Sequence, residues 1–145
     1  MSLENLLAIN RLARHEASAA AAVKLLAAAQ RNLADSRAVN ITAENRFHAA
    51  YTAIMQCATV ALWMQGYRTP TSEAGHHQTT LQTLPLSLGL GQETVIVLDK
   101  LRKQRNLADY SGDTVSNAAL AECVHQAEAL LKLVRGRVRK RWPKA

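Results

Sequence analysis

The polar residues between positions 102 and 110 have types and a spacing that suit the binding of an anion. On a helix, Arg105 falls on the same face as the apolar residues Leu98, Leu101 and Ala108. A guanidinium beside an apolar stripe requires a carboxylate, a ligand or another chain, because burying it unpaired is costly. Asp109, one turn later, can supply the carboxylate, so an ordinary arginine–aspartate pair at the rim of a helical bundle is one interpretation.

The other interpretation is a phosphate-binding site, because a guanidinium can bind phosphate oxygens with two parallel hydrogen bonds. The residues that would form it, whether in binding or in catalysis, are Arg102, Arg105, Asn106, Asp109 and Tyr110. Arg68, His76 and His77 could join them from an upstream loop and the start of the next helix.

The remaining histidines and the known catalytic motifs add little. His15, His48 and His125 are expected to be isolated surface or rim residues. The adjacent His76 and His77 should point in different directions, and no cysteine or acid has the spacing of a zinc site. Glycine-rich phosphate loops, GxSxG and HExxH patterns are absent from the sequence. We therefore expect neither a metal site nor a cofactor.

The elements that must position these residues are predicted to be helices. Apolar spacing and caps predict helices over 3–13, from Ser18 to about residue 38, from Thr42 to Gly66, near 76–88, over 93–110, and from Thr114 or Ser116 onward. The segment from Tyr67 to Gly75 is predicted to be a loop, and no β-branched run is long enough for a sheet. The fold class predicted is all-α, an up-down bundle of five to six helices.

Composition agrees with one helical domain over 1–140, followed by a basic tail over 141–145. Aromatic residues make up only 4% of the chain, so the core should consist mainly of Ala, Leu and Val. The net charge of +7 resides wholly in residues 132–145, which hold seven cations and no acid. Such a segment can attract nucleic acid or another polyanion, or can be solvated, and Trp142 could stack on a base.

Location is inferred from the same features. The first residues lack the pattern of a signal peptide, and no stretch has the length and apolar character of a membrane span. Cys57 and Cys123 form no CxxC pair and are expected to be buried free thiols. These features favour a cytoplasmic protein with no membrane partner.

Two stretches together resemble the HEPN domain family. They are RKQRNLADYSG, with its Arg-Asn pair late in a core helix, and ENRFHAAYTAIMQCATVALWMQGYRTPTSEAGHHQTTLQTLP upstream. The resemblance covers about residues 20 to 140. It implies a helical bundle, commonly a homodimer, whose arginine motifs face one cleft. Many members act in toxin–antitoxin or other defence systems, and active members are metal-independent ribonucleases.

The resemblance implies that Arg105 and Asn106 match the catalytic motif, whereas Tyr110 stands where a His is usual. A tyrosine, with a pKa near 10, is a poor general base at neutral pH, so we expect binding of a nucleotide, RNA or a partner protein rather than efficient cleavage. The alternatives are an active endoribonuclease toxin, with Tyr110, His76 or His77 as the base, and a companion subunit of a nucleotidyltransferase-type antitoxin without a ligand of its own.

Overall fold

The computed structural model of the protein describes residues 1–72 and 74–144; Glu73 of the predicted loop and Ala145 of the predicted tail lie outside them. Its long helices are α2 (Ala19–Ser36), α3 (Ala43–Met64), α6 (Gln92–Ser111) and α7 (Asn117–Arg141). The shorter elements are α1 (Leu3–Ala8), β1 (Ala13–Arg14), β2 (Tyr67–Arg68), α4 (His76–Gln82) and α5 (Leu84–Leu88).

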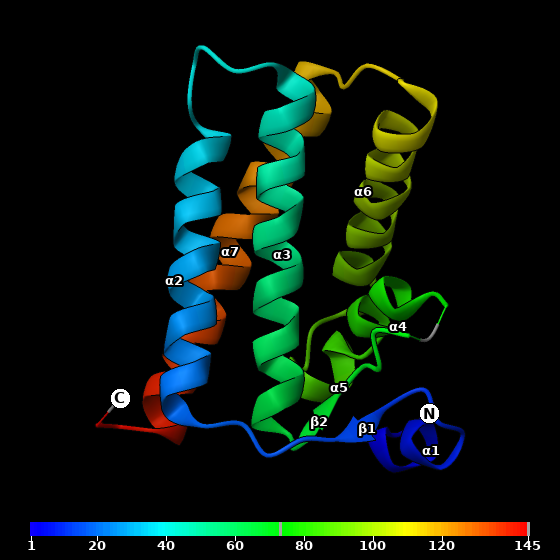
Figure 1. The fold of residues 1–145 in the computed structure, drawn as a ribbon, viewed down its shortest axis with the longest axis vertical. Helices are drawn as coiled ribbons and strands as arrows, with labels where there is room; N and C mark the ends of the chain where they lie inside the picture. Colours follow the sequence, from blue (N-terminus) through cyan, green and yellow to red (C-terminus); the bar gives the residue numbers. More distant parts are fainter. Residues whose placement is uncertain (73, 145) are drawn as a thin grey trace.

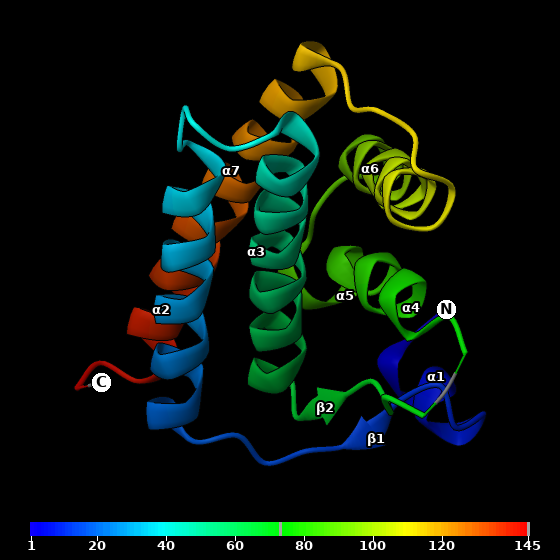
Figure 2. The ribbon, with the colours of Figure 1, turned by 45° about the horizontal axis from the view of Figure 1, so that its top comes forward.

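The long helices alternate in direction and form an up-down bundle around α3 (Figure 1). Helix α3 packs against α2 and α7 on one side and against α4, α5 and α6 on the other (Figure 2). The predicted all-α bundle is therefore confirmed. Among the described residues, no helix has both the length and the apolar character needed to span a bilayer.

Side-chain caps begin three of the long helices. The hydroxyl oxygens of Ser18, Thr42 and Ser116 each accept a hydrogen bond from the backbone N–H three residues later. The first two caps are those predicted, and the structure selects Ser116 over Thr114 for the last helix. The helix predicted near 76–88 is divided at Thr83, which ends α4 and precedes Leu84 and Pro85 in the first turn of α5.

Small side chains fill the core where α2, α3 and α7 meet. Fully buried alanines occur on all three helices: Ala22, Ala29, Ala50, Ala53, Ala58, Ala61 and Ala127. Cys57 and Cys123 lie in the same core as free thiols, as predicted, and burial raises the pKa of each thiol to about 12. Phe47 and Tyr51 are the large buried aromatic residues of α3.

The N-terminal segment corrects two predictions. Helix α1 ends at Ala8 instead of continuing to Ala13, because Asn10 adopts a left-handed conformation (φ 62°) that turns the chain. The chain then forms β1, which pairs antiparallel with β2, Ala13 opposite Arg68. Tyr67 and Arg68 are thus in a short strand where a loop was predicted, and the two-stranded sheet forms without a run of β-branched residues.

The last helix reaches the first residue of the predicted tail. Helix α7 ends at Arg141. Trp142 packs against the main hydrophobic core, and its backbone N–H donates to the carbonyl of Val138 over 2.8 Å. Much of the chain's surplus charge is therefore displayed on an ordered helix.

Candidate anion-binding site

The C-terminal half of α6 places its two arginines at the edge of the interface with α3. Val95, Leu98 and Leu101 are buried on the apolar side of α6, as predicted. The side chains of Arg102 and Arg105 are only 17% and 18% exposed to solvent. We call the group around them the arginine site, composed of Arg102, Arg105, Asn106 and Asp109 from α6, His48 and Tyr51 from α3, and His77 from α4.

Arg105 is held on several sides by the protein. Its Nε lies 3.0 Å from Oδ2 of Asp109, and its Nη1 donates to Oδ1 of Asn106 over 3.2 Å. The Nε–H is not aligned for a hydrogen bond, so the contact with Asp109 is chiefly ionic. A guanidinium has five N–H donors, and three of them, on Nη1 and Nη2, have no partner within the described chain.

Two tyrosine rings lie near this guanidinium. The Cζ atom of Arg105 is 5.5 Å from the ring centre of Tyr51 and 6.0 Å from that of Tyr110, within the range of cation–π attraction. Tyr51 is 1% exposed and Tyr110 is 78% exposed, so the guanidinium lies between the core and the surface. The position that Tyr110 occupies is therefore open to solvent.

The Tyr51 hydroxyl is buried and lacks a hydrogen-bond partner in the described chain. Burial raises the pKa of Tyr51 to about 12, although the positive charges of Arg105 and Arg102 oppose this shift. The phenol therefore keeps its proton. A buried donor without an acceptor costs about 1–3 kcal/mol, a cost that an anionic ligand could remove.

His48 belongs to the site, contrary to its predicted isolation. Its Nδ1 lies 3.4 Å from Oδ2 of Asp109, so one carboxylate contacts both this ring and Arg105. His48 is on α3, three residues before Tyr51, and its side chain is half exposed. The spacing of His48 and Tyr51 along one helix was the available sequence signal, but periodicity alone does not show which neighbour faces them.

His77, on α4, lies near Tyr51 and His76. Its ring centre is 6.1 Å from that of Tyr51 and 4.6 Å from that of His76, which it meets edge-on. The two adjacent histidines are thus in contact, whereas the sequence suggested that they diverge. Burial, and then the charges of His76, Arg105 and Arg102, lower the pKa of His77, which favours its neutral form.

Arg102 is paired within α6. Its Nε donates to Oδ1 of Asp99 over 2.8 Å, and Nζ of Lys103 lies 3.4 Å from the other oxygen of Asp99. Burial acts to raise the pKa of Asp99, but the hydrogen bonds and charges of Arg102 and Lys103 outweigh it and lower that pKa. Residues 99–109 hold four cations, Lys100 included, and two carboxylates, so this part of α6 has two surplus positive charges.

Arg68 lies apart from the arginine site. It is exposed on β2, beyond the C-terminal end of α3, whereas His48 is near the N-terminal end of that helix. The residues between His48 and Met64 span roughly 24 Å of helix. Of the predicted site residues, the structure therefore brings together those on α6 with His76 and His77, but does not add Arg68.

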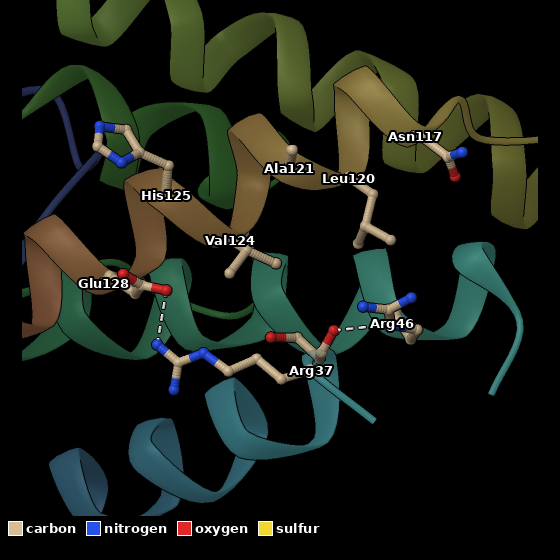
Figure 3. A pocket seen from close by; sticks show the side chains of 9 residues that line it. Arg37, Arg46, Asn117, Leu120, Ala121, Val124, His125 and Glu128 are labelled. Carbon is tan, nitrogen blue, oxygen red and sulfur yellow. Dashed lines mark hydrogen bonds and ion pairs between the residues drawn. The ribbon is translucent and has the colours of Figure 1, made fainter. Parts of the chain in front are cut away.

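A separate hollow of about 460 Å³ lies between α2, α3 and α7 (Figure 3). Its arginines are engaged in structural contacts. Arg37 is 2.6 Å from Glu128, and Nε of Arg46 donates to the carbonyl of Ser36 over 2.9 Å. This pairing neutralises Arg37 and fixes Arg46, so the hollow has less capacity to bind an anion than the arginine site.

The fold and the site together define an all-α bundle with a positively charged cluster of arginine, histidine and tyrosine at one edge. Within residues 1–72 and 74–144, no three His, Cys, Asp or Glu side chains converge as metal ligands. No family model, curated protein or solved structure matches the chain.

We predict that Arg105→Gln raises the pKa of His77 toward 6.5, because it removes one of the charges that disfavour the imidazolium. An NMR titration of the His77 ring measures this shift, with Lys100→Gln, exposed on the same helix, as the charge-matched control. Equal shifts in both variants would contradict the proximity of Arg105.

In wild type, the lowered pKa of His77 makes the protein less stable as the pH falls below 6.5, because the unfolded chain binds this proton more tightly.

Proposed function

We propose that the arginine site binds the phosphate group of a nucleotide or of RNA. The observation that carries the proposal is the half-buried guanidinium of Arg105, oriented by Asp109 and Asn106, with three N–H donors left without a partner in the described chain. The contacts with Asp109 and Asn106 restrict the side chain before any ligand arrives, which reduces the entropy lost on binding. The similarity of residues 102–112 to the HEPN motif favours the same class of ligand.

The neighbouring groups favour an anion over a cation. The surplus positive charge on α6, the protonated Tyr51 and the partly buried Arg102 all suit a ligand rich in acceptor oxygens. Hydrogen bonds between a guanidinium and phosphate are short and strong, and they strengthen where water is partly excluded.

Titration with inorganic phosphate and with adenosine 5′-monophosphate tests the proposal. We expect each to shift the NMR signals of the His48 and His77 rings in wild type and in Lys100→Gln. Arg105→Ala should remove the shift, because it deletes the donors that face the ligand. Absence of any shift in wild type, or an equal shift in Arg105→Ala, would refute phosphate binding at this site.

A second candidate function, metal-independent cleavage of RNA, is favoured by the contact between His48 and Asp109. Asp109 lies on the Nδ1 side of the His48 ring, so Nε2 is the nitrogen available to a substrate. Nε2 of His48 would donate a proton to the leaving 5′-oxygen. His77, kept neutral, would accept the proton of the attacking 2′-hydroxyl, so that a 2′,3′-cyclic phosphate and a 5′-hydroxyl form.

If the site cleaves RNA, purified protein will degrade mixed cellular RNA in the presence of a chelator. Arg105→Ala and His48→Gln would each lower the rate by about 10²-fold or more. Tyr110→Phe would retain activity, because its exposed hydroxyl is not part of the proton transfer. If the wild-type protein is inactive, this candidate is eliminated, and phosphate binding is then decided by the titration described above. If Tyr110→Phe loses activity, Tyr110 is the general base.

We also propose that the protein forms a homodimer through α6. Ile96, Leu107 and Tyr110 lie on the outward side of this helix and are 56%, 46% and 78% exposed. Residues 96 and 107 are separated by about three turns, so these side chains form one exposed stripe along α6. Pairing two such stripes would join two chains along this helix, and the HEPN resemblance implies a homodimer.

Light scattering tests the dimer directly. We expect wild type to have the mass of two chains and Leu107→Glu the mass of one, because a buried unpaired carboxylate opposes association. Val39→Glu is the matched control, since Val39 is 92% exposed in the turn between α2 and α3. A monomeric wild type, or the same loss in Val39→Glu, would contradict the proposal.

A further inference from the structure

A groove of about 490 Å³ lies between the segment that joins β1 to α2, the C-terminal end of α3 and the end of α7, away from the arginine site. The segment joining β1 to α2 passes the C-terminal end of α3, and the last turn of α7 ends nearby (Figure 1). The groove is lined by Arg14, His15, Glu16, Ala17, Trp63, Met64, Gln65, Gly66, Arg141 and Trp142. Both tryptophans of the chain are among them, and we call it the tryptophan groove.

Backbone pairing holds the walls of the tryptophan groove in place. Arg14 is paired with Tyr67 in the β1–β2 ladder, and the N–H of His15 donates to the carbonyl of Gly66 over 2.9 Å. These bonds place the His15 ring 5.1 Å from that of Trp63 at an inclination of 42°. On the opposite wall, the guanidinium of Arg141 lies 5.1 Å from the ring centre of Trp142.

Both tryptophans are partly buried. They pack against the main core, and each also lines the groove. An aromatic ring supported by the core is a rigid platform for stacking and loses little entropy on binding a flat ligand. In a chain with 4% aromatic residues, the placement of both tryptophans in one groove is a specific feature of this end of the molecule.

Cations continue from the tryptophan groove along α7. Trp142 also lines the next hollow, with Arg135 and Arg139, and these two arginines line a third with Lys132. Glu16 is the acid that lines the groove itself, and Glu128, farther along, is paired with Arg37. The result is a row of positive charge leading away from a pair of aromatic rings.

We propose that the tryptophan groove binds single-stranded nucleic acid, with an unpaired base against the tryptophan rings and the adjoining phosphates against Arg14 and along the arginines of α7. Stacking platforms combined with a cationic track are the means by which proteins bind single strands without reading their sequence. A duplex, whose bases are already stacked on one another, fits the groove less well. This site is independent of the arginine site and does not require that phosphate binds there.

Intrinsic tryptophan fluorescence reports on this groove alone, because its two tryptophans are the only ones in the chain. We expect a short oligouridylate to quench the emission at low salt. Trp142→Ala should weaken binding, measured by anisotropy of a labelled oligouridylate, roughly 5- to 150-fold, the usual effect of losing one stacking ring. Arg14→Gln, at an exposed position on β1, should reduce the slope of log K against log salt by about 0.7.

Two controls separate this proposal from its alternatives. Arg31→Gln removes one charge from the exposed surface of α2, outside the groove residues, and should change affinity much less than Arg14→Gln. Arg105→Ala should leave the quenching intact, so failure of the arginine site does not affect this result. The proposal is overturned if wild type shows no quenching, if both Trp142→Ala and Arg14→Gln bind like wild type, or if Arg31→Gln weakens binding as much as Arg14→Gln.

Discussion

The packing of α6 against α3 is the constraint on which the arginine site depends. Leu98 and Leu101 bury one side of α6 against the core, and this contact fixes the rotation of the helix. This rotation places the guanidinium of Arg105, one turn after Leu101, close to the ring of Tyr51. Asp109, one further turn on, is brought to His48. One apolar contact thus determines which polar groups of two helices meet.

The same contact explains why a single carboxylate is shared. Asp109 is close to both Arg105 and His48, at 3.0 and 3.4 Å. A ligand that draws Arg105 away from Asp109 would leave this carboxylate in contact with His48 alone. Arg105 on α6 and His48 on α3 are therefore linked through one side chain.

Much of the fold could be predicted because its signals are local. The capping hydroxyls of Ser18 and Thr42 and the apolar periodicity of the long helices are encoded within a few residues. The early end of α1 was missed because the strand that follows the turn at Asn10 pairs with β2, more than fifty residues away in the sequence. The pairing of Arg105 with Asp109 was predictable for the same local reason, whereas His48 and Tyr51 required knowledge of which face of α3 meets α6.

The buried thiols of Cys57 and Cys123 have a practical consequence. Neither is exposed, and burial keeps both protonated at neutral pH, so a thiol reagent meets almost no thiolate in the folded protein. Because both lie in the main core formed by α2, α3 and α7, they react only when these helices separate. The rate of alkylation of these two cysteines then reports how often the bundle opens, and no label has to be introduced.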